Sequence, residues 1–129
     1  MKIILDTNFL LVPMQFKVDI FLEIERIVHE KYELYVLDKT VDELNRLALN
    51  RNKKVKDRDA AKLAIKIAVA KGVKTIKTTS DKYADDLIVE IADKNTVVAT
   101  NDIDLRRRVR NKGAKTILMR KKAFLVLSE

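Results

Sequence analysis

Carboxylates are the side chains through which this sequence could do chemistry, because most other reactive side chains are rare or absent. The 129-residue chain has no cysteine, one histidine (His29) and two glycines. These counts exclude disulfides, zinc–thiolate sites, thiol nucleophiles and glycine-rich phosphate-binding loops. Catalysis would therefore depend on carboxylates, lysines, hydroxyl groups or a metal ion.

Six acidic residues follow apolar segments that predict β-strands. They are Asp6, Glu43, Asp85, Asp86, Asp102 and Asp104. Asp6 comes directly after the first such segment, and Asp102 comes just after the fourth. In open parallel sheets, ligands bind beyond the carboxyl ends of the strands, near the switch in strand order. We expect the acids to gather at that edge of the sheet.

Each acid taken alone has a simpler structural explanation. The segment from Thr40 to Glu43 fits a capping box, Asn101 and Asp102 fit a helix cap, and Asp6 could belong to a turn. Four or more carboxylates at one edge, however, would repel one another and raise some pKa values unless a cation neutralised them. Hard oxygen ligands suit Mg²⁺ or Mn²⁺, and either ion can activate water and polarise a phosphoryl oxygen.

The elements that would position these acids alternate along the chain. Strands are predicted at residues 2–5, 34–37, 73–77, 96–100 and 116–119, with an edge strand at 124–127. Helices are predicted at residues 18–31, 41–49, 58–71, 81–93 and 104–111. Gly72 and Gly113 would end the third and the last of these helices. Continuous apolar strands are typical of a parallel sheet covered on both faces, so residues 1–129 are predicted to form one α/β domain.

The net charge of +8 is concentrated in two segments. Residues 101–122 contain nine basic and two acidic residues, and residues 45–60 contain six basic and two acidic ones. This imbalance favours a polyanion-binding surface, although a lysine-rich thermophilic surface is the alternative. The residues expected to contact substrate phosphates are Lys53, Lys54, Lys56, Arg106 and Arg110.

The sequence also bears on where the protein acts. No apolar run approaches the roughly 20 residues that a membrane-spanning helix needs. Asp6 interrupts the apolar N-terminal stretch, and no small-residue cleavage site follows it, so a signal peptide is not predicted. We expect a cytoplasmic protein.

Four short segments, spread over the length of the chain, form a family pattern. They are residues 3–8 (IILDTN), 41–44 (VDEL), 84–92 (ADDLIVEIA) and 98–105 (VATNDIDL). In this order and at this spacing they resemble the PIN-domain family of ribonucleases. Residues 9–21, 83–86 and 99–108 further resemble the ribosome-processing endonuclease branch of the family and its archaeal relatives.

The resemblance implies a three-layer α/β/α sandwich with strand order 3-2-1-4-5, in which Asp6 and Asp102 follow the strands that flank the switch point. It implies RNA cleavage by one or two divalent ions, Mg²⁺ or Mn²⁺, leaving a 5′-phosphate and a 3′-hydroxyl. By position, the catalytic metal-binding residues would be Asp6, Glu43, Asp85 and Asp102.

The resemblance also implies roles for residues around this quartet. Asp85 matches the family acid better than Asp86, because of the apolar and small residues that follow it. Asp104 and Asp86 would be accessory metal ligands. Asn8 and Thr100 would orient the carboxylates or a metal-bound water.

The leading interpretation is an endoribonuclease that acts on ribosomal RNA precursors. A VapC-like toxin that cuts tRNA or rRNA and is held by an antitoxin uses the same chemistry, and a non-catalytic RNA-binding PIN domain would keep the fold alone. Haloacid-dehalogenase phosphatases and receiver domains also place Asp after the first strand, but their further acids are missing here. The partners considered are RNA, a second copy of the chain, an antitoxin and a ribosome-assembly protein.

Overall fold

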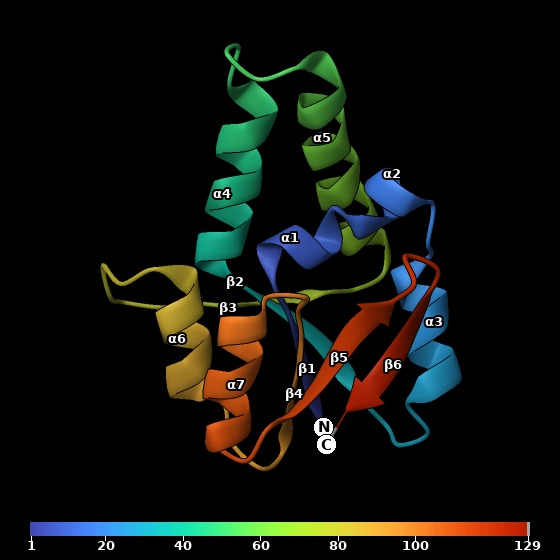
Figure 1. The fold of residues 1–129 in the computed structure, drawn as a ribbon. Helices are drawn as coiled ribbons and strands as arrows, with labels where there is room; N and C mark the ends of the chain where they lie inside the picture. The colour runs from blue at the N-terminus through green and yellow to red at the C-terminus, as the bar shows by residue number, and fades with distance from the viewer. Residues whose placement is uncertain (129) are drawn as a thin grey trace.

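One six-stranded sheet, in the order β3-β2-β1-β4-β5-β6, forms the centre of the molecule (Figure 1). This computed structural model describes residues 1–128. The strands are β1 (Lys2–Leu5), β2 (Glu33–Leu37), β3 (Lys74–Ile76), β4 (Thr96–Ala99), β5 (Lys115–Arg120) and β6 (Phe124–Ser128). The helices are α1 (Thr7–Leu10), α2 (Val12–Phe16), α3 (Ile20–Ile27), α4 (Asp38–Leu49), α5 (Val55–Ala70), α6 (Ala84–Ile91) and α7 (Ile103–Asn111).

The strand order confirms the predicted arrangement. Neighbouring strands from β3 through β5 are parallel, and β6 runs antiparallel to β5 as the predicted edge strand. Leu5 at the end of β1 pairs with Ala99 at the end of β4. The chain builds the sheet outward from β1 through β2 and β3, and then returns to β4 on the other side of β1. The switch point therefore lies between β1 and β4.

Side chains of the central strands alternate between two cores. Ile3 and Leu5 of β1 belong to a large core with residues of α1–α5, whereas Ile4 belongs to a smaller core with α6 and α7. This alternation of side chains has the two-residue period expected for a strand. Because the strands are buried on both faces, they appear in the sequence as unbroken apolar runs. The result is the predicted three-layer sandwich, with α6 and α7 packed side by side on one face (Figure 1).

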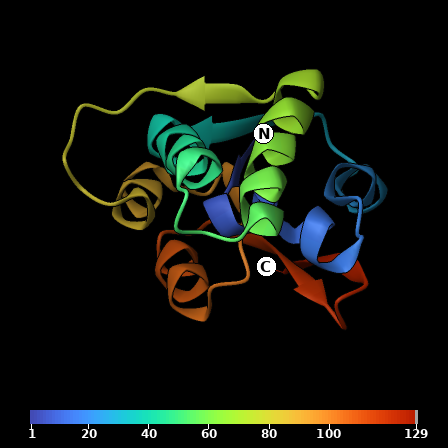
Figure 2. The ribbon, with the colours of Figure 1, turned by 90° about the horizontal axis from the view of Figure 1, so that it is seen from above.

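The helices that carry candidate site residues surround the carboxyl end of β1. Seen from above, α1, α4, α6 and α7 gather around this point (Figure 2). α4 and α5 pack against each other as a hairpin that extends beyond the sheet (Figure 1). Gly72 and Gly113 follow α5 and α7 with φ of 70° and 90°, a conformation that favours glycine, so the two predicted helix ends are confirmed.

The structure corrects several predicted boundaries. The short helices α1 and α2 were not predicted, because four or five residues cannot show a helical period. The predicted capping box at Thr40 is wrong, since α4 begins at Asp38 and Thr40 is a fully buried residue of its first turn. The helix predicted at residues 18–31 is shorter, because Asp19 caps α3 and Val28 is already extended.

The remaining boundary changes are small. Helix α5 begins three residues before the predicted start at residue 58, and α6 is shorter at both ends than the predicted 81–93. Within residues 1–128, no helix combines the length and the apolar character needed to cross a bilayer.

Candidate active site

Asp6 lies at the carboxyl end of β1, beside the end of β4. Its side chain is only 7% exposed, and its backbone N–H donates to the carbonyl of Ala99 at 3.0 Å. The Thr100 hydroxyl donates to Asp6 Oδ2 at 2.8 Å and accepts from the backbone N–H of Asp102 at 3.1 Å. One buried hydroxyl therefore connects the Asp6 carboxyl to the segment that carries Asp102.

Burial raises the pKa of Asp6 from its ordinary value of 3.8 to about 6. The charges of Asp85 and Asp102 raise this pKa further, whereas hydrogen bonds from the Thr100 hydroxyl and the Thr7 backbone lower it. Removal from water disfavours the ionised form of a carboxyl, and nearby negative charges add to the effect. The acids that follow β1 and β4 and the acid on α6 are therefore close enough to interact.

Glu43 on α4 and Asp85 on α6 reach the same region. Desolvation raises the pKa of Glu43, the charge of Asp85 adds to this, and a hydrogen bond with the Thr7 side chain opposes it. Desolvation also raises the pKa of Asp85, and the charge of Asp102 is the next largest cause. Asp85 thus interacts electrostatically with Asp6, Glu43 and Asp102.

Asp102 has a structural function as well as a place near the other acids. It is the N-cap residue of α7, and its Oδ1 accepts a hydrogen bond from the Leu105 backbone N–H at 3.0 Å. The first turn of a helix leaves such N–H groups without partners inside the helix. The predicted helix cap at this position is confirmed.

Asp86 and Asp104 each form an ion pair with an arginine of α7. Arg108 Nη2 lies 2.7 Å from Asp86 Oδ1, and Arg107 pairs with Asp104. The charge of Arg108 also lowers the pKa of Asp85. Each of these two acids would have to share or leave its arginine to reach a metal ion.

Two residues near the acids were not predicted. Thr7 is buried, its Oγ1 lies 3.1 Å from Thr40 Oγ1, and its side-chain hydrogen bond lowers the pKa of Glu43, whereas its predicted neighbour Asn8 is exposed. The sequence feature that could have indicated Thr7 is its hydroxyl side chain between Asp6 and Asn8. For Arg108, nothing in the run of three arginines indicated which of them would face α6.

The acids suit a divalent cation in their chemistry, although no metal-ligand geometry is formed in advance. Among residues 1–128, no group of three or more Asp, Glu or His side chains is placed to hold a metal ion as it stands. Asp6 and Asp102 use one carboxylate oxygen each in hydrogen bonds to Thr100 and Leu105. A hard cation would offset the desolvation and mutual repulsion that raise the pKa values of Asp6, Glu43 and Asp85, provided that the side chains turned toward it.

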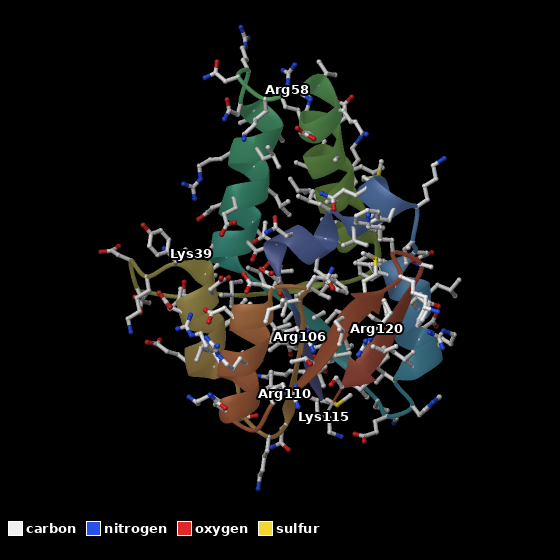
Figure 3. All side chains as sticks on the ribbon, viewed as in Figure 1. Lys39, Arg58, Arg106, Arg110, Lys115 and Arg120 are labelled. Atoms are coloured by element: carbon white, nitrogen blue, oxygen red, sulfur yellow. The ribbon has the colours of Figure 1, made fainter. Side chains whose placement is uncertain are left out.

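The predicted phosphate-binding residues lie in two separate places. Lys53 and Lys54 are exposed in the turn between α4 and α5, and Lys56 is exposed in the first turn of α5. Arg106 and Arg110 lie along α7 (Figure 3). The hairpin and α7 extend away from the carboxyl end of β1 in different directions (Figure 1). The acids therefore lie between the two basic regions.

The fold and the acidic side chains define a doubly wound α/β protein with carboxylates gathered at its switch point. A family model described as a PIN like domain matches residues 3–122. The chain belongs to the PIN-like domain family, which confirms the family predicted from the sequence.

Known relatives of this chain include ribonucleases. Ribonuclease VapC4 of Methanocaldococcus jannaschii is 34% identical over 125 residues, which cover 95% of this chain and 93% of that protein. The structure of the PIN domain endonuclease Utp24 matches with a TM-score of 0.79 and 26% identity, covering 98% of this chain and 90% of that one. These similarities support an RNA-cleaving nuclease.

A more distant structure shares the fold. VapBC-1 from nontypeable Haemophilus influenzae matches with a TM-score of 0.56 at 16% identity, covering 90% of this chain and 98% of that one. At this level of identity the match shows a common fold and nothing more.

Proposed function

We propose that this protein is a metal-dependent endoribonuclease in which Asp6, Glu43, Asp85 and Asp102 hold Mg²⁺ or Mn²⁺. The observation that carries the proposal is the raised pKa of the buried Asp6 carboxyl, caused by burial and by the charges of Asp85 and Asp102. Carboxylates that destabilise one another in this way gain most from a shared cation. The similarity to Ribonuclease VapC4 and to the endonuclease Utp24 supports the same activity.

A bound ion would supply an activated water and polarise a phosphoryl oxygen, so that hydrolysis leaves a 5′-phosphate and a 3′-hydroxyl. The protein positions the carboxylates for this task. The Thr100 hydroxyl fixes one oxygen of Asp6, and the Thr7 hydroxyl hydrogen-bonds Glu43. Asp85 is the preferred acid of α6, because its neighbour Asp86 is paired with Arg108.

The other predicted site residues have narrower roles in this proposal. Asp104 and Asp86 become accessory ligands only when they share their carboxylates with the arginines that they now pair with. Asn8 is exposed at the start of α1, two residues after Asp6, and is proposed to orient a water molecule or an RNA phosphate.

The basic regions provide the contacts to RNA phosphates. Lys53, Lys54 and Lys56 would bind the strand on one side of the acids, and Arg106 and Arg110 on the other. Leu49 lies six residues after Glu43 along α4, a rise of about 9 Å. The lysines at the end of this helix are therefore within a few nucleotides of the bond to be cut.

The proposed substrate is a ribosomal RNA precursor in the cytoplasm, following the resemblance of residues 9–21, 83–86 and 99–108 to the ribosome-processing branch. A toxin held by an antitoxin is the second candidate, and the similarity to Ribonuclease VapC4 favours it. Induced expression and loss of the gene separate the two candidates. A toxin arrests growth unless a neighbouring antitoxin gene is expressed with it, whereas loss of a processing enzyme causes uncut precursor to accumulate.

The activity itself is tested with structured RNA, Mn²⁺, the wild-type protein and the Asp6→Asn variant. We expect Mn²⁺-dependent internal cuts by the wild type and a loss of cutting by at least about a hundredfold in the variant. RNA affinity should change little, because binding and cutting use charges of opposite sign. Equal cutting by both proteins would contradict the proposal. Binding of RNA without any cutting would identify a non-catalytic domain.

A further inference from the structure

One face of α7 combines an apolar side chain with several cations directly beside the proposed metal ligands. Ile103, the first residue of α7, immediately follows Asp102. Arg106, Arg107 and Arg110 lie three, four and seven residues further along, which places them on the same helical face as Ile103. These residues and Asn111 line a surface hollow of about 430 Å³, which we call the α7 hollow.

Ile103 is not needed for the core of the protein. Its side chain is 77% exposed, whereas Leu105 and Val109 are the residues through which α7 packs on the sheet. An isoleucine that meets water at the mouth of a charged hollow is available to pack against a flat apolar surface. The face of a nucleic-acid base is such a surface.

The arginines of the α7 hollow differ in their present contacts. Arg107 is paired with Asp104, so part of its charge is already neutralised. Among the residues that the structure describes, the Nε atom of Arg106 is buried without a hydrogen-bond partner. Buried guanidinium N–H groups nearly always have an acceptor. The rest of the Arg106 side chain lines the hollow, so an anionic oxygen placed there would meet its guanidinium group, and a shift of the side chain would be needed to bring that oxygen to Nε.

We propose that the α7 hollow is a nucleotide subsite that holds the unit of RNA next to the bond to be cut. The base packs against Ile103, the phosphate is bound by Arg106, and Asn111, which lines the same hollow eight residues after Ile103, offers an amide to the rest of the nucleotide. The combination of an apolar surface, a cation and an amide matches the parts of a nucleotide. This inference rests on the proposed ribonuclease function and assigns residues to substrate positioning.

A second exposed apolar side chain, at the start of the acid-bearing helix α6, supports this arrangement. Tyr83, the N-cap residue of α6, is 84% exposed and stands two residues before Asp85. Two of the three helices that bring an acid to the site, α6 and α7, therefore have an exposed apolar residue at or next to their first position.

The subsite can be tested by fluorescence, because the chain contains no tryptophan. In the Asp6→Asn background, which keeps RNA uncut, Ile103→Trp introduces one indole into the α7 hollow. The matched control is Val69→Trp, in the last turn of α5, where the native side chain is 74% exposed. The probes are a short single-stranded oligoribonucleotide and the same sequence in a duplex.

We expect the single strand to quench the Ile103→Trp emission saturably and the duplex to quench it much less, because paired bases are not free to stack. The Val69→Trp emission should stay unchanged. Adding Arg106→Gln should weaken the apparent Kd by about tenfold, the effect of losing one charged hydrogen bond. In cleavage assays, Ile103→Ala should raise KM by about tenfold and leave kcat nearly unchanged.

Three results would overturn the subsite: equal quenching of both tryptophans, an unchanged Kd with Arg106→Gln, or an Ile103→Trp emission that shifts with protein concentration when RNA is absent. The last result would mean that a second copy of the chain covers the hollow. Failure of the proposed ribonuclease function would be recognised separately. A wild-type protein that cuts no RNA, combined with saturable quenching, would remove the nuclease activity and leave the α7 hollow as a nucleotide-binding site only.

Discussion

At neutral pH the ionised carboxyl of Asp6 lowers the stability of the folded state. Its pKa is about 6 in the folded protein against an ordinary value of 3.8, so the folded state holds a proton that the unfolded chain has already released. A group whose folded pKa is raised in this way favours folding at low pH. That stability is lost as the pH rises between these two values.

Removing this carboxyl should therefore stabilise the metal-free protein. We expect Asp6→Asn to raise the free energy of unfolding by up to about 3 kcal/mol near pH 8, and by much less near pH 4. Denaturant unfolding in the presence of a chelator measures both values. The same difference at both pH values would show that the effect is not due to ionisation of Asp6.

The Thr100 hydroxyl makes a second prediction at the scale of single residues. Its hydrogen bond to Asp6 Oδ2 lowers the pKa of that carboxyl, so Thr100→Val should raise it. The acidic limb of the pH–rate profile should then move to higher pH, by about one unit or less. Thr100→Ser keeps the hydroxyl and serves as the control. If the valine and serine variants gave the same profile, the hydroxyl would have no such influence.

Among the elements, those with a long hydrophobic pattern were predictable and the short ones were not. β1 matches its prediction residue for residue, because the apolar run ends at the charged Asp6. α7 differs from its prediction by one residue, because Asp102 caps it and Gly113 ends it. α1 and α2 each contain five residues or fewer, and their place is decided by packing of residues such as Phe9 against the sheet.

The same distinction applies to the candidate site. The gathering of the acids at one edge of the sheet could be predicted, because the switch-point rule depends only on the order of the strands. The positions of Thr7 and Arg108 depend on how α1 meets α4 and how α6 meets α7, which one sequence does not specify. Asp86 shows the same limit, since its partner Arg108 lies on another helix, whereas Asp104 pairs with Arg107 three residues along α7, a spacing that the sequence displays.

Helix α3 protects the outer edge of the sheet. Leu125 of β6 directs its backbone groups away from β5, where Glu23 Oε1 accepts from its N–H and Arg26 Nη2 donates to its carbonyl, both at 3.0 Å. Glu23 and Arg26 also pair with each other at 2.8 Å. An uncovered edge strand can pair with another chain, so these contacts limit association through β6.

Breaking this contact should affect both stability and association. We expect Glu23→Ala to lower the free energy of unfolding by about 1 kcal/mol, the usual effect of losing one hydrogen bond. Sedimentation at increasing protein concentration should show added self-association compared with the wild type. Glu25→Ala, on the exposed side of the same helix, is the control. A monomeric Glu23→Ala protein would mean that the edge is protected by other features.

At the scale of the whole molecule, positive charge lies on both sides of an acidic centre. Binding of RNA to such a surface releases counterions and weakens as salt increases. The three lysines of the hairpin, Lys53, Lys54 and Lys56, are exposed, so they can each meet a phosphate without any change in the fold.

The salt dependence should report these contacts. Replacing all three lysines by glutamine should reduce the slope of log K against log salt by about two, since each phosphate contact to a single strand contributes roughly 0.7. Filter binding at several salt concentrations gives the slope. Asp6→Asn should leave it unchanged. If the triple variant kept the wild-type slope, the hairpin would lie outside the RNA path.

The parallel pairing of β1 with β4 has a consequence for the time at which the protein becomes active. Asp6 is made almost first, but Asp102 joins it only when residues 96–99 have been synthesised and have paired with residues 2–5. A growing chain that ends before this point contains Asp6, Glu43 and Asp85 but lacks Asp102, the fourth proposed metal ligand. Under the proposed function, the metal centre would therefore stay incomplete on the ribosome until Asp102 has been synthesised and β4 has paired with β1.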